Sequence, residues 1–304
     1  MNHLVQYTSC PVCKNQSIHQ VLEVKDFTVS NELFPIMECN GCGLRFTQNI
    51  PCETAIQQYY QSSNYISHSN SKKGIINRLY HFARTFTMMS KEALVKKATG
   101  RSVGMLLDVG SGTGTFVHTM AVAGWNVVGV EPDAAARAYA FKKYNSDIYP
   151  AEELFMLPES TYDAITMWHV LEHVHRLDEY ITQLKKILAP GGKLIIAVPN
   201  YKSKDAHIYK EQWASYDVPR HLYHFSPQSM RKLMEQHGLK VITTKPMWLD
   251  SFYISMLSER NQKGNILRAL WNGTMSNFNA LFNKEKSSSL VYVIAVPTLE
   301  DLNS

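Results

Sequence analysis

From about residue 105 onward, the pattern of apolar and polar positions predicts strands that alternate with helices. Residues 105–109 (MLLDV) form a short apolar run that is typical of a buried strand, and a glycine-rich turn follows at once. Residues 117–124 (VHTMAVAG) have helical spacing and end on a glycine, and residues 125–133 (WNVVGVEPD) supply a second strand. This order predicts a βαβ unit whose turn lies at the carboxyl end of the first strand.

The alternation continues toward the end of the chain. Two more apolar runs, 239–246 and 290–297, predict the last strands, and about 249–284 has the spacing of two inserted helices. We therefore expect an α/β domain over residues 100–304, preceded by a helical linker or cap over 53–99.

Composition and charge exclude several classes of protein. Of the 304 residues, 45% are hydrophobic and 19% are charged, which is typical of an ordered soluble protein. The net charge of +5 permits an anionic ligand but is too small for the concentrated basic surface that binds nucleic acid. The first ten residues lack the apolar core of a signal peptide, and no apolar run approaches the roughly 18 residues of a membrane span. We expect a cytoplasmic protein.

Four of the five cysteines form two CxxC pairs separated by 25 residues. In a reducing compartment, such pairs predict a tetrahedral zinc site rather than disulfides, and a redox CxxC site would need only one pair, at a helix N-terminus. We expect residues 1–52 to form a small zinc-ribbon-like module. A closed shell of thiolates contributes to folding and leaves no position for catalysis. The predicted ligands are Cys10, Cys13, Cys39 and Cys42.

The residues that follow each pair differ. Gly43 follows the second pair and frees the backbone to turn, whereas Lys14 stands at the equivalent position after the first. The gap between the pairs is wider than the usual spacing of about 15–20 residues, so a small hairpin such as Ile18 to Thr28 is expected to fill it.

The glycine-rich turn favours a ligand other than a dinucleotide. Its glycines are Gly110, Gly112 and Gly114, and Thr115 stands where the dinucleotide motif has its third glycine. Asp108 precedes the turn, and a carboxylate there would repel a pyrophosphate. The ligand is therefore expected to offer a cationic group and hydroxyls.

A second acidic residue extends this interpretation. Glu131, 23 residues after Asp108, ends the second predicted strand. A carboxylate at that position accepts hydrogen bonds from a ribose diol in nucleotide-binding α/β folds.

These features resemble the class I S-adenosylmethionine-dependent methyltransferase family, whose first motif is similar to residues 108–114 (DVGSGTG). The similarity continues in the family's order through 151–174 (AEELFMLPESTYDAITMWHVLEHV), where it implies a strand that begins at Asp163. It extends through 184–200 (LKKILAPGGKLIIAVPN), where it implies a helix, a Pro-Gly-Gly turn and a further strand, and covers about residues 100–245. The resemblance implies a Rossmann-like, seven-stranded methyltransferase fold with helices on both faces. It also implies S-adenosylmethionine as the cofactor.

The resemblance implies the parts of a cofactor site as well. The glycine turn and Asp108 would hold the methionine moiety, Glu131 the ribose, and the stretch around Glu152 the adenine. A solvent-exposed face is the alternative for Glu152. The implied cofactor-binding residues are Asp108, Gly110, Ser111, Gly112, Gly114, Glu131, Pro132, Glu152, Trp168 and His169.

The histidine-rich stretch 168–175 (WHVLEHVH) follows the predicted fourth strand. Trp168 and His169 are expected at its end, facing the cofactor. His169 and His173 are four residues apart and could share a helix face. A zinc-protease motif needs a glutamate directly after the first histidine, whereas Glu172 comes three residues later, which argues against a catalytic metal. We expect Glu172 and His173 to orient the loop or to border the acceptor.

Residues 201–226 form an insert that is expected to cover the acceptor site. The alternative is a structured loop in which Asp217 and Arg220 pair with each other and Trp213 fills the core. A helix is expected to begin after Ser226, with a proline at its first position.

The functional hypothesis is a methyltransferase that acts on a small-molecule acceptor, without distinguishing O-, N- or C-methylation. Most of its acceleration would come from positioning, with a general base where the acceptor is a hydroxyl. One alternative is an RNA methyltransferase whose zinc module binds RNA, which the mild charge disfavours. Another is a non-catalytic, zinc-bearing interaction protein. The candidate bases are His169 first, and then His173, His221 and Asp217.

Overall fold

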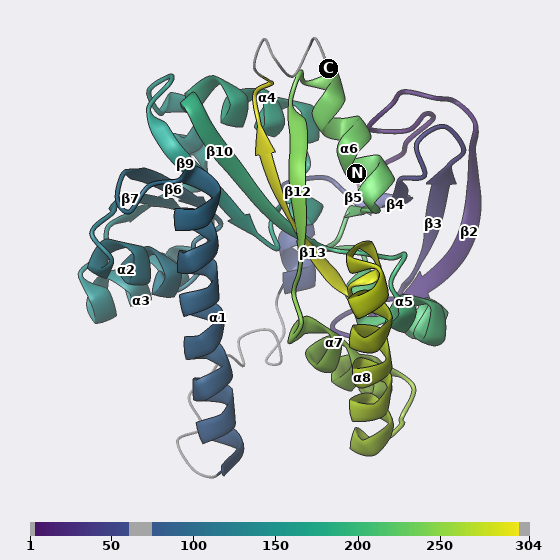
Figure 1. The fold of residues 1–304 in the computed structure, drawn as a ribbon. Helices are drawn as coiled ribbons and strands as arrows, with labels where there is room; N and C mark the ends of the chain where they lie inside the picture. The colour runs from purple at the N-terminus through teal and green to yellow at the C-terminus, as the bar shows by residue number, and fades with distance from the viewer. Residues whose placement is uncertain (1–3, 61–74, 298–304) are drawn as a thin grey trace.

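The computed structural model describes residues 4–60 and 75–297, with the backbone alone for residues 75–86. Its centre is a seven-stranded mixed sheet in the order β8–β7–β6–β9–β10–β13–β12 (Figure 1). The strands from β8 to β10 are parallel, and β13 is antiparallel to both of its neighbours. This confirms the predicted seven-stranded α/β fold. The strands are β6 (Met105–Val109), β7 (Asn126–Val130), β8 (Ile148–Tyr149), β9 (Tyr162–Trp168), β10 (Leu188–Pro199), β12 (Lys240–Pro246) and β13 (Ser289–Ala295).

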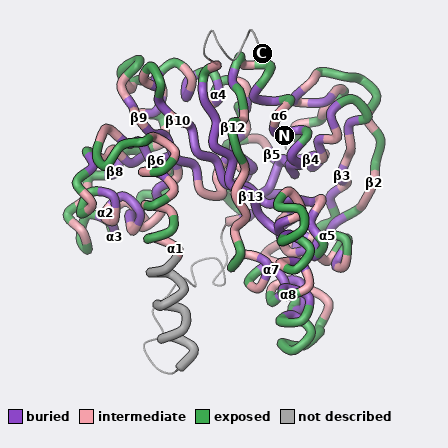
Figure 2. The backbone as a smooth tube through the Cα atoms, in the orientation of Figure 1, coloured by how far each residue is buried: buried purple, intermediate pink, exposed green. Residues whose placement is uncertain are grey.

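Helices cover both faces of this sheet because its central strands are apolar on both sides. Successive strand residues point to opposite faces. Leu106 of β6 therefore packs in one core with residues of α1 and α2, and Leu107 packs in another with residues of α4 and α6. The buried strands lie between the two helical layers in Figure 2. The helices are α1 (Ile75–Thr99), α2 (Thr115–Val122), α3 (Ala134–Tyr144), α4 (Leu177–Ile187) and α6 (Pro227–Gln236).

The start of α6 is as predicted from the sequence. The Ser226 side chain accepts a hydrogen bond from the Ser229 backbone N–H, the Ser229 hydroxyl bonds back to Ser226, and Pro227 is the first helical residue. This capping box satisfies two backbone groups that a helix end otherwise leaves without partners.

The N-terminal module and the insert share one sheet. Strands β2 (Ile18–Lys25), β3 (Leu33–Cys39) and β4 (Arg45–Thr47) of the module are extended by β11 (Tyr223–His224), which comes from the insert. The hairpin between the two cysteine pairs spans β2 and β3 and is longer than expected. Strand β1 (Leu4–Val5) pairs separately with β5 (Ile50–Pro51). The module is therefore completed by a strand from the far end of the insert.

A long helix connects the module to the central sheet. The 3-10 helix η1 (Ile56–Tyr60) and α1 both lie in the segment 53–99 that was expected to be a helical linker or cap. Helix α1 packs against β9 and β10 and extends past the ends of the strands (Figure 1). Residues 61–74 of the predicted linker lie outside the described residues, as do 1–3 and 298–304 of the predicted end domains.

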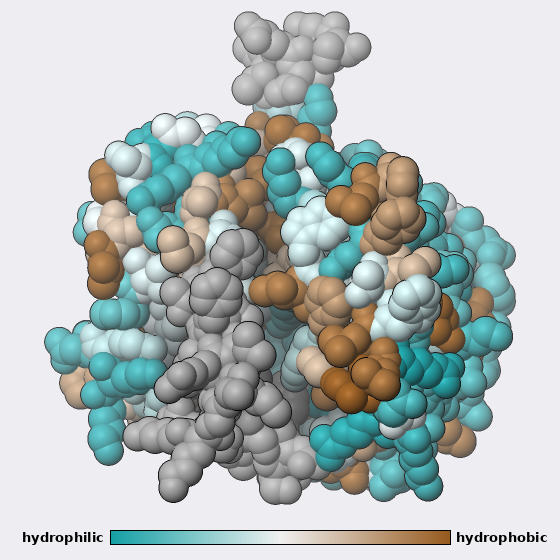
Figure 3. All heavy atoms as spheres, turned by 60° about the horizontal axis from the view of Figure 1, so that its bottom comes forward, coloured by the Kyte–Doolittle hydropathy of each residue, from teal (hydrophilic) through white to brown (hydrophobic). Residues whose placement is uncertain are grey.

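Three helices pack together near the end of β12 and the start of β13: α5 (Lys204–Tyr209), α7 (Asp250–Asn261) and α8 (Ile266–Phe282). The outer face of α8 exposes Leu267, Trp271 and Phe282. Figure 3 brings this end of the molecule forward and shows hydrophobic residues grouped on its surface. Within the described part of the chain, no helix combines the length and the apolar character needed to cross a membrane.

Candidate functional site

The carboxyl ends of β6 and β9 lie where the path of the chain across the sheet reverses. From β6 the chain continues outward through β7 and β8, and then returns to β9 and β10 on the other side. Ligands of open α/β sheets bind at such a point because the connections diverge and leave a crevice. Asp108 lies near the end of β6, and the glycine turn follows it. Trp168 is the last residue of β9, and His169 follows it.

The three glycines of the turn have different roles. All three have positive φ, at 73° for Gly110, 52° for Gly112 and 73° for Gly114. A Cβ on Gly110 would lie 2.3 Å from the Val170 side chain, and one on Gly114 would lie 2.7 Å from Cβ of Ala140. These two glycines therefore permit close packing. A Cβ on Gly112 would meet no atom within 4 Å, so this position faces open space where a ligand can approach the backbone.

Asp108 is a buried carboxylate directly before this turn. Its Oδ1 accepts a hydrogen bond of 2.6 Å from the Thr166 hydroxyl of β9, and its backbone oxygen accepts one of 2.8 Å from the Ser111 hydroxyl. Burial raises the pKa of Asp108 to about 7, against the opposing effects of Thr166 and of the Lys91 ammonium. A cationic ligand would stabilise the ionised form, so Asp108 suits a positively charged group.

Lys91 of α1 belongs to the same crevice, although the sequence analysis did not single it out. Its Nζ lies 4.2 Å from the ring centroid of Trp168. Burial lowers the pKa of Lys91 to about 8, with the Asp108 and Asp250 carboxylates opposing the shift. A lone lysine in a helical stretch carries no motif, and only the packing of α1 on the sheet places it here.

The buried indole N–H of Trp168 has no hydrogen-bond partner among the described residues. Its ring packs edge-to-face on Phe116, with centroids 5.4 Å apart. Buried donors are normally satisfied. A ligand that accepts this hydrogen bond would therefore fit the crevice.

Glu131 follows β7 on the other side of the turn. Its Oε2 accepts a hydrogen bond of 2.8 Å from the Gly112 N–H, and its Oε1 accepts one of 3.0 Å from the Asp133 N–H. Burial raises the pKa of Glu131. The carboxylate thus lies against the open glycine. Pro132 is exposed, and so is Glu152 on the 3-10 helix η2 (Ala151–Met156).

His169 is held between two carboxylates. Its Nδ1 lies 3.4 Å from Oε1 of Glu172, and its Nε2 lies 3.1 Å from Oδ2 of Asp250 at the start of α7. Burial lowers the pKa of His169, but the two carboxylates outweigh it and raise the pKa to about 10. An imidazolium cannot accept a proton, so this arrangement argues against His169 as the general base.

His173 and His221 are neighbours with ring centroids 4.6 Å apart. The Nδ1–H of His173 donates to the Arg220 carbonyl at 3.0 Å, and that of His221 donates to the Ser215 carbonyl at 2.8 Å. In the neutral form of each ring, the lone pair is therefore on Nε2. Burial lowers the pKa of His173 to about 4, which keeps this ring neutral near pH 7.

His173 does not share an α-helix face with His169. His169 has φ 59°, and the next element is the short 3-10 helix η3 (Leu171–His173). The chain therefore turns at His169, and the two rings have different surroundings.

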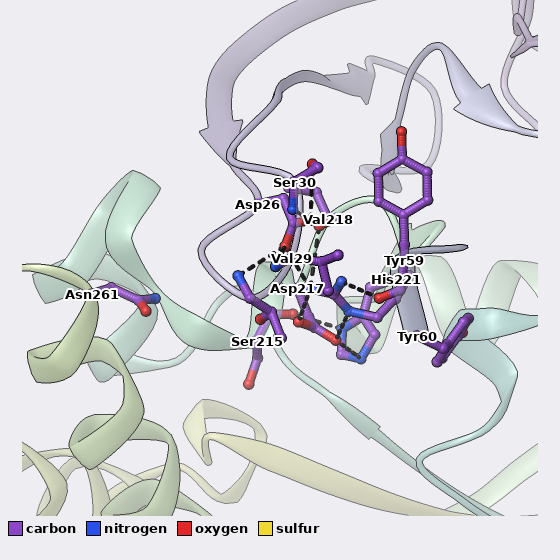
Figure 4. A network of polar contacts seen from close by, with 12 residues as sticks. Asp26, Val29, Ser30, Tyr59, Tyr60, Ser215, Asp217, Val218, His221 and Asn261 are labelled. Atoms are coloured by element: carbon purple, nitrogen blue, oxygen red, sulfur yellow. Dashed lines mark hydrogen bonds and ion pairs between the residues drawn. The ribbon is translucent and has the colours of Figure 1, made fainter. Parts of the chain in front are cut away.

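Asp217 is engaged in a buried ion pair. Arg220, whose side chain is fully buried, donates to both oxygens of Asp217 at 2.7 and 3.0 Å and to Oδ1 of Asp26 at 2.9 Å. The Arg220 guanidinium holds the pKa of Asp217 low despite the burial of that carboxylate. Figure 4 shows Asp26 and Ser30 of the N-terminal module lying against Asp217 and Val218 of the insert. Asp217 and Arg220 thus form the ion pair of the structured-loop alternative.

The two CxxC pairs lie together at the other end of the module. Sγ of Cys10 is 3.6 Å from that of Cys42, and Sγ of Cys13 is 3.4 Å from that of Cys39. The four sulfur atoms all lie within 4.8 Å of one another, and all four cysteines are free thiols.

Both cysteine pairs have the same turn. The N–H of Lys14 donates to the Cys10 carbonyl and that of Gly43 to the Cys39 carbonyl, and both residues have positive φ, 59° and 69°. Lys14 therefore adopts the conformation that Gly43 adopts more easily. Four thiols on two matched turns have the chemistry and arrangement of a structural zinc site.

Comparisons with known proteins agree with this geometry. Ubiquinone biosynthesis O-methyltransferase, mitochondrial, of Rattus norvegicus is 27% identical over 186 residues, which are 53% of this chain and 53% of that protein. Ubiquinone biosynthesis O-methyltransferase of Photobacterium profundum is 33% identical over 106 residues, 33% of this chain and 45% of that protein. The chain spans about half the length of these relatives.

A solved structure has the same fold, and a family model matches directly. The crystal structure of magnesium protoporphyrin IX methyltransferase from Synechocystis PCC 6803 with bound SAH has 16% identity and a TM-score of 0.52, and the match covers 79% of this chain and 97% of that one. The family model, described as a methyltransferase domain, matches residues 81–244, which are more than half of the 304 residues. The chain therefore belongs to the methyltransferase domain family.

Proposed function

We propose that this protein transfers a methyl group from S-adenosylmethionine to a small-molecule acceptor. One observation carries the proposal: the buried Asp108 carboxylate and the open Gly112 backbone lie together at the reversal point between β6 and β9. S-adenosylmethionine supplies a methyl group bonded to a positively charged sulfur. A carboxylate next to an exposed backbone suits such a cation, whereas it would repel a pyrophosphate.

Different residues of the crevice would bind different parts of the proposed cofactor. Asp108 would bind the amino group of the methionine moiety, and Lys91, which the sequence did not indicate, would bind its carboxylate. Glu131 would exchange its bond with the Gly112 N–H for bonds to the ribose hydroxyls. Trp168 would donate its free indole N–H. For Ser111, Gly110 and Gly114 we propose a role in shaping the turn, and for Pro132 and Glu152 a position at the exposed adenine end.

On the acceptor side, we propose that the chain acts mainly by positioning. A methyl transfer needs the acceptor atom in line with the bond that breaks, and rigid walls supply that alignment. His169, fixed by Glu172 and Asp250, would form one wall. Of the four candidate bases, His173 and His221 are favoured when no metal ion occupies their Nε2 atoms, because each ring is oriented with Nε2 available to accept a proton. The relatives named as O-methyltransferases support a hydroxyl group as the acceptor.

We propose a domain organisation close to the predicted one. Residues 1–52 form the module and residues 100–304 the methyltransferase domain, with α1 of the 53–99 segment contributing Lys91 to the cofactor site. The module, with zinc on its four cysteines, would serve as a platform for the insert, because β4 pairs with β11 and Asp26 pairs with Arg220. This role favours a structural module over an RNA-binding one.

A labelled-methyl assay tests the proposal. The protein is incubated with S-adenosylmethionine carrying a radioactive methyl group, together with either a cellular small-molecule extract or total RNA. We expect label in the small-molecule fraction, absent with Asp108→Asn. Label in RNA alone would contradict the small-molecule acceptor, and label in neither fraction would contradict the activity.

A further inference from the structure

We propose that Glu172, His173 and His221 bind a divalent transition-metal ion at the acceptor end of the site. One ligand atom from each of the three residues lies within 4.8 Å of the others. Glu172 and His173 follow β9, and His221 comes from the insert, so the site lies where the insert meets the strand end. Ion binding does not depend on methyl transfer, whereas a role in holding the acceptor rests on the proposed function.

The Glu172 carboxylate has one charged neighbour, the His169 ring, but its hydrogen-bonding capacity is unused within the part of the chain that the structure describes. Its side chain is fully buried, and neither oxygen has a hydrogen-bond partner among the described residues. Its nearest cation is Nδ1 of His169, 3.4 Å from Oε1 and outside hydrogen-bond geometry. No lysine or arginine in the described ranges, 4–60 and 87–297, forms an ion pair with it. Because buried charges are normally paired or coordinate metals, a cation beside Glu172 would complete its environment.

The two histidines have the orientation of metal ligands. Each donates its Nδ1–H to a backbone carbonyl, His173 to Arg220 and His221 to Ser215, which leaves Nε2 with its lone pair. Metal-ligating histidines are typically fixed in this way by a carbonyl or carboxylate on the other ring nitrogen.

A buried network holds the segment that carries these carbonyls. Arg220 is bound by Asp26 and Asp217, and Oδ2 of Asp217 lies 4.0 Å from Nε2 of His221 (Figure 4). The Tyr60 hydroxyl lies 3.1 Å from Nδ1 of His173. The coordinating groups are therefore positioned before any ion arrives.

The ligand set indicates the class of ion. Two imidazoles and one carboxylate suit Zn²⁺, Fe²⁺, Mn²⁺ or Co²⁺ better than Ca²⁺ or Mg²⁺, which prefer oxygen ligands. Ligands bound at about 2.1 Å lie roughly 3–4 Å apart, so small side-chain rotations would close the site. Three protein ligands leave open positions, where an oxygen of the acceptor could bind. The four-cysteine cluster has no such position.

Cobalt titration tests the site. The protein is first given one equivalent of zinc, which the four thiolates should bind in preference to the histidine and glutamate site, and Co²⁺ is then added while visible absorption is recorded. We expect one further equivalent to bind with a spectrum that lacks the sulfur-to-cobalt charge-transfer bands of a thiolate site. His173→Gln and His221→Gln should each weaken this binding by at least about 100-fold, since even the loss of a group that only orients a ligand costs roughly 10–100-fold. His175→Gln is the matched control and should bind as the wild type does.

The proposal is overturned if no Co²⁺ binds beyond the cysteine cluster, or if binding survives both substitutions unchanged while circular dichroism shows that the variants are folded. S-adenosylhomocysteine binding is measured on the same samples. Cobalt bound as expected without any binding of S-adenosylhomocysteine would support the metal site and contradict the proposed function. The reverse result would contradict the metal site alone.

Discussion

Oδ1 of Asp108 lies 2.6 Å from the hydroxyl oxygen of Thr166, across the neighbouring strands β6 and β9. The Thr166 hydroxyl donates this hydrogen bond to the Asp108 carboxylate, which lowers the pKa of Asp108. Burial outweighs that effect and raises the pKa to about 7. The most buried charge of the cofactor crevice is therefore titrated close to neutral pH. This relationship links the affinity of the cofactor to pH.

The first prediction concerns that pH dependence. Below about pH 7, Asp108 must release a proton before it can bind a cation, so cofactor affinity should fall roughly tenfold per pH unit. Asp108→Asn keeps an oxygen acceptor for Thr166 but has no charge. We expect it to bind S-adenosylmethionine more weakly at pH 8 and to lose this pH dependence. Calorimetric titrations between about pH 5.5 and 8.5 measure both effects, and an equal slope in the variant would contradict the assignment. Lys91 and Glu131 are ionisable groups near Asp108, and their charges also affect cofactor binding. The comparison with Asp108→Asn isolates the part of the pH dependence that comes from Asp108.

Asp108→Asn should weaken cofactor binding but stabilise the folded protein when no ligand is bound. The folded-state pKa of Asp108 is raised, so the stabilising contribution of its neutral form is present below about pH 4 and is lost as the pH rises toward 7. Asparagine mimics the neutral form. Asp108→Asn should therefore stabilise the ligand-free protein at pH 8 by roughly 1–4 kcal/mol. Urea unfolding at pH 8 measures this difference, and a loss of stability would contradict the buried-carboxylate interpretation.

Lys91 is predicted to recognise the carboxylate of the methionine moiety. Lys91→Gln should weaken binding of S-adenosylhomocysteine by about 10–100-fold, the cost of one charge-assisted hydrogen bond. It should leave adenosine, which lacks that carboxylate, almost unaffected. Lys96→Gln is the control on the same helix, because Lys96 pairs with Glu92 at 2.8 Å. Equal weakening of both ligands would argue against a carboxylate contact.

The Arg220 network is predicted to hold the insert on the module. Arg220→Met removes the partner of the buried Asp26 carboxylate and of the partly buried Asp217 carboxylate, and should cost about 3–5 kcal/mol of unfolding free energy. Arg176→Gln removes an exposed pair with Glu179 and should cost less than about 1 kcal/mol. Urea unfolding of the two variants gives the comparison. A smaller loss for Arg220 than for Arg176 would contradict a structural role for the network.

The cysteine cluster is predicted to carry a zinc ion that stabilises the module. In the cobalt-substituted protein, Cys39→Ser should abolish the sulfur-to-cobalt charge-transfer bands and lower the melting temperature. Cys52→Ser is the control, since Cys52 lies outside the cluster of four thiols. Charge-transfer bands that persist in Cys39→Ser would show that the ion is bound elsewhere.

The sequence predicted the parts of the fold that depend on local pattern. The apolar run 105–109 located β6, three glycines located the ligand turn, and Ser226 with Pro227 located the start of α6. Each of these signals lies within a few residues of the feature it specifies. Local propensity and burial then agree with the global fold.

The remaining features depend on long-range packing, which spacing does not encode. Lys91 reaches Trp168 only because α1 packs across the sheet, and β11 pairs with β4 from the far end of the insert. The ranking of His169 as first candidate base did not anticipate Asp250, which lies 81 residues later and occupies its Nε2. The comparison of residues 168–175 with the zinc-protease motif could not place His221 beside Glu172 and His173, because His221 comes from the insert.

Calorimetric titration of the full chain with S-adenosylhomocysteine measures whether a sulfur nucleoside occupies the crevice beside Asp108. We predict that one molecule binds per chain at micromolar affinity or tighter, and that Asp108→Asn and Lys91→Gln each weaken the binding. No binding at about 1 mM, or binding of NAD at this crevice instead, would contradict the cofactor assignment.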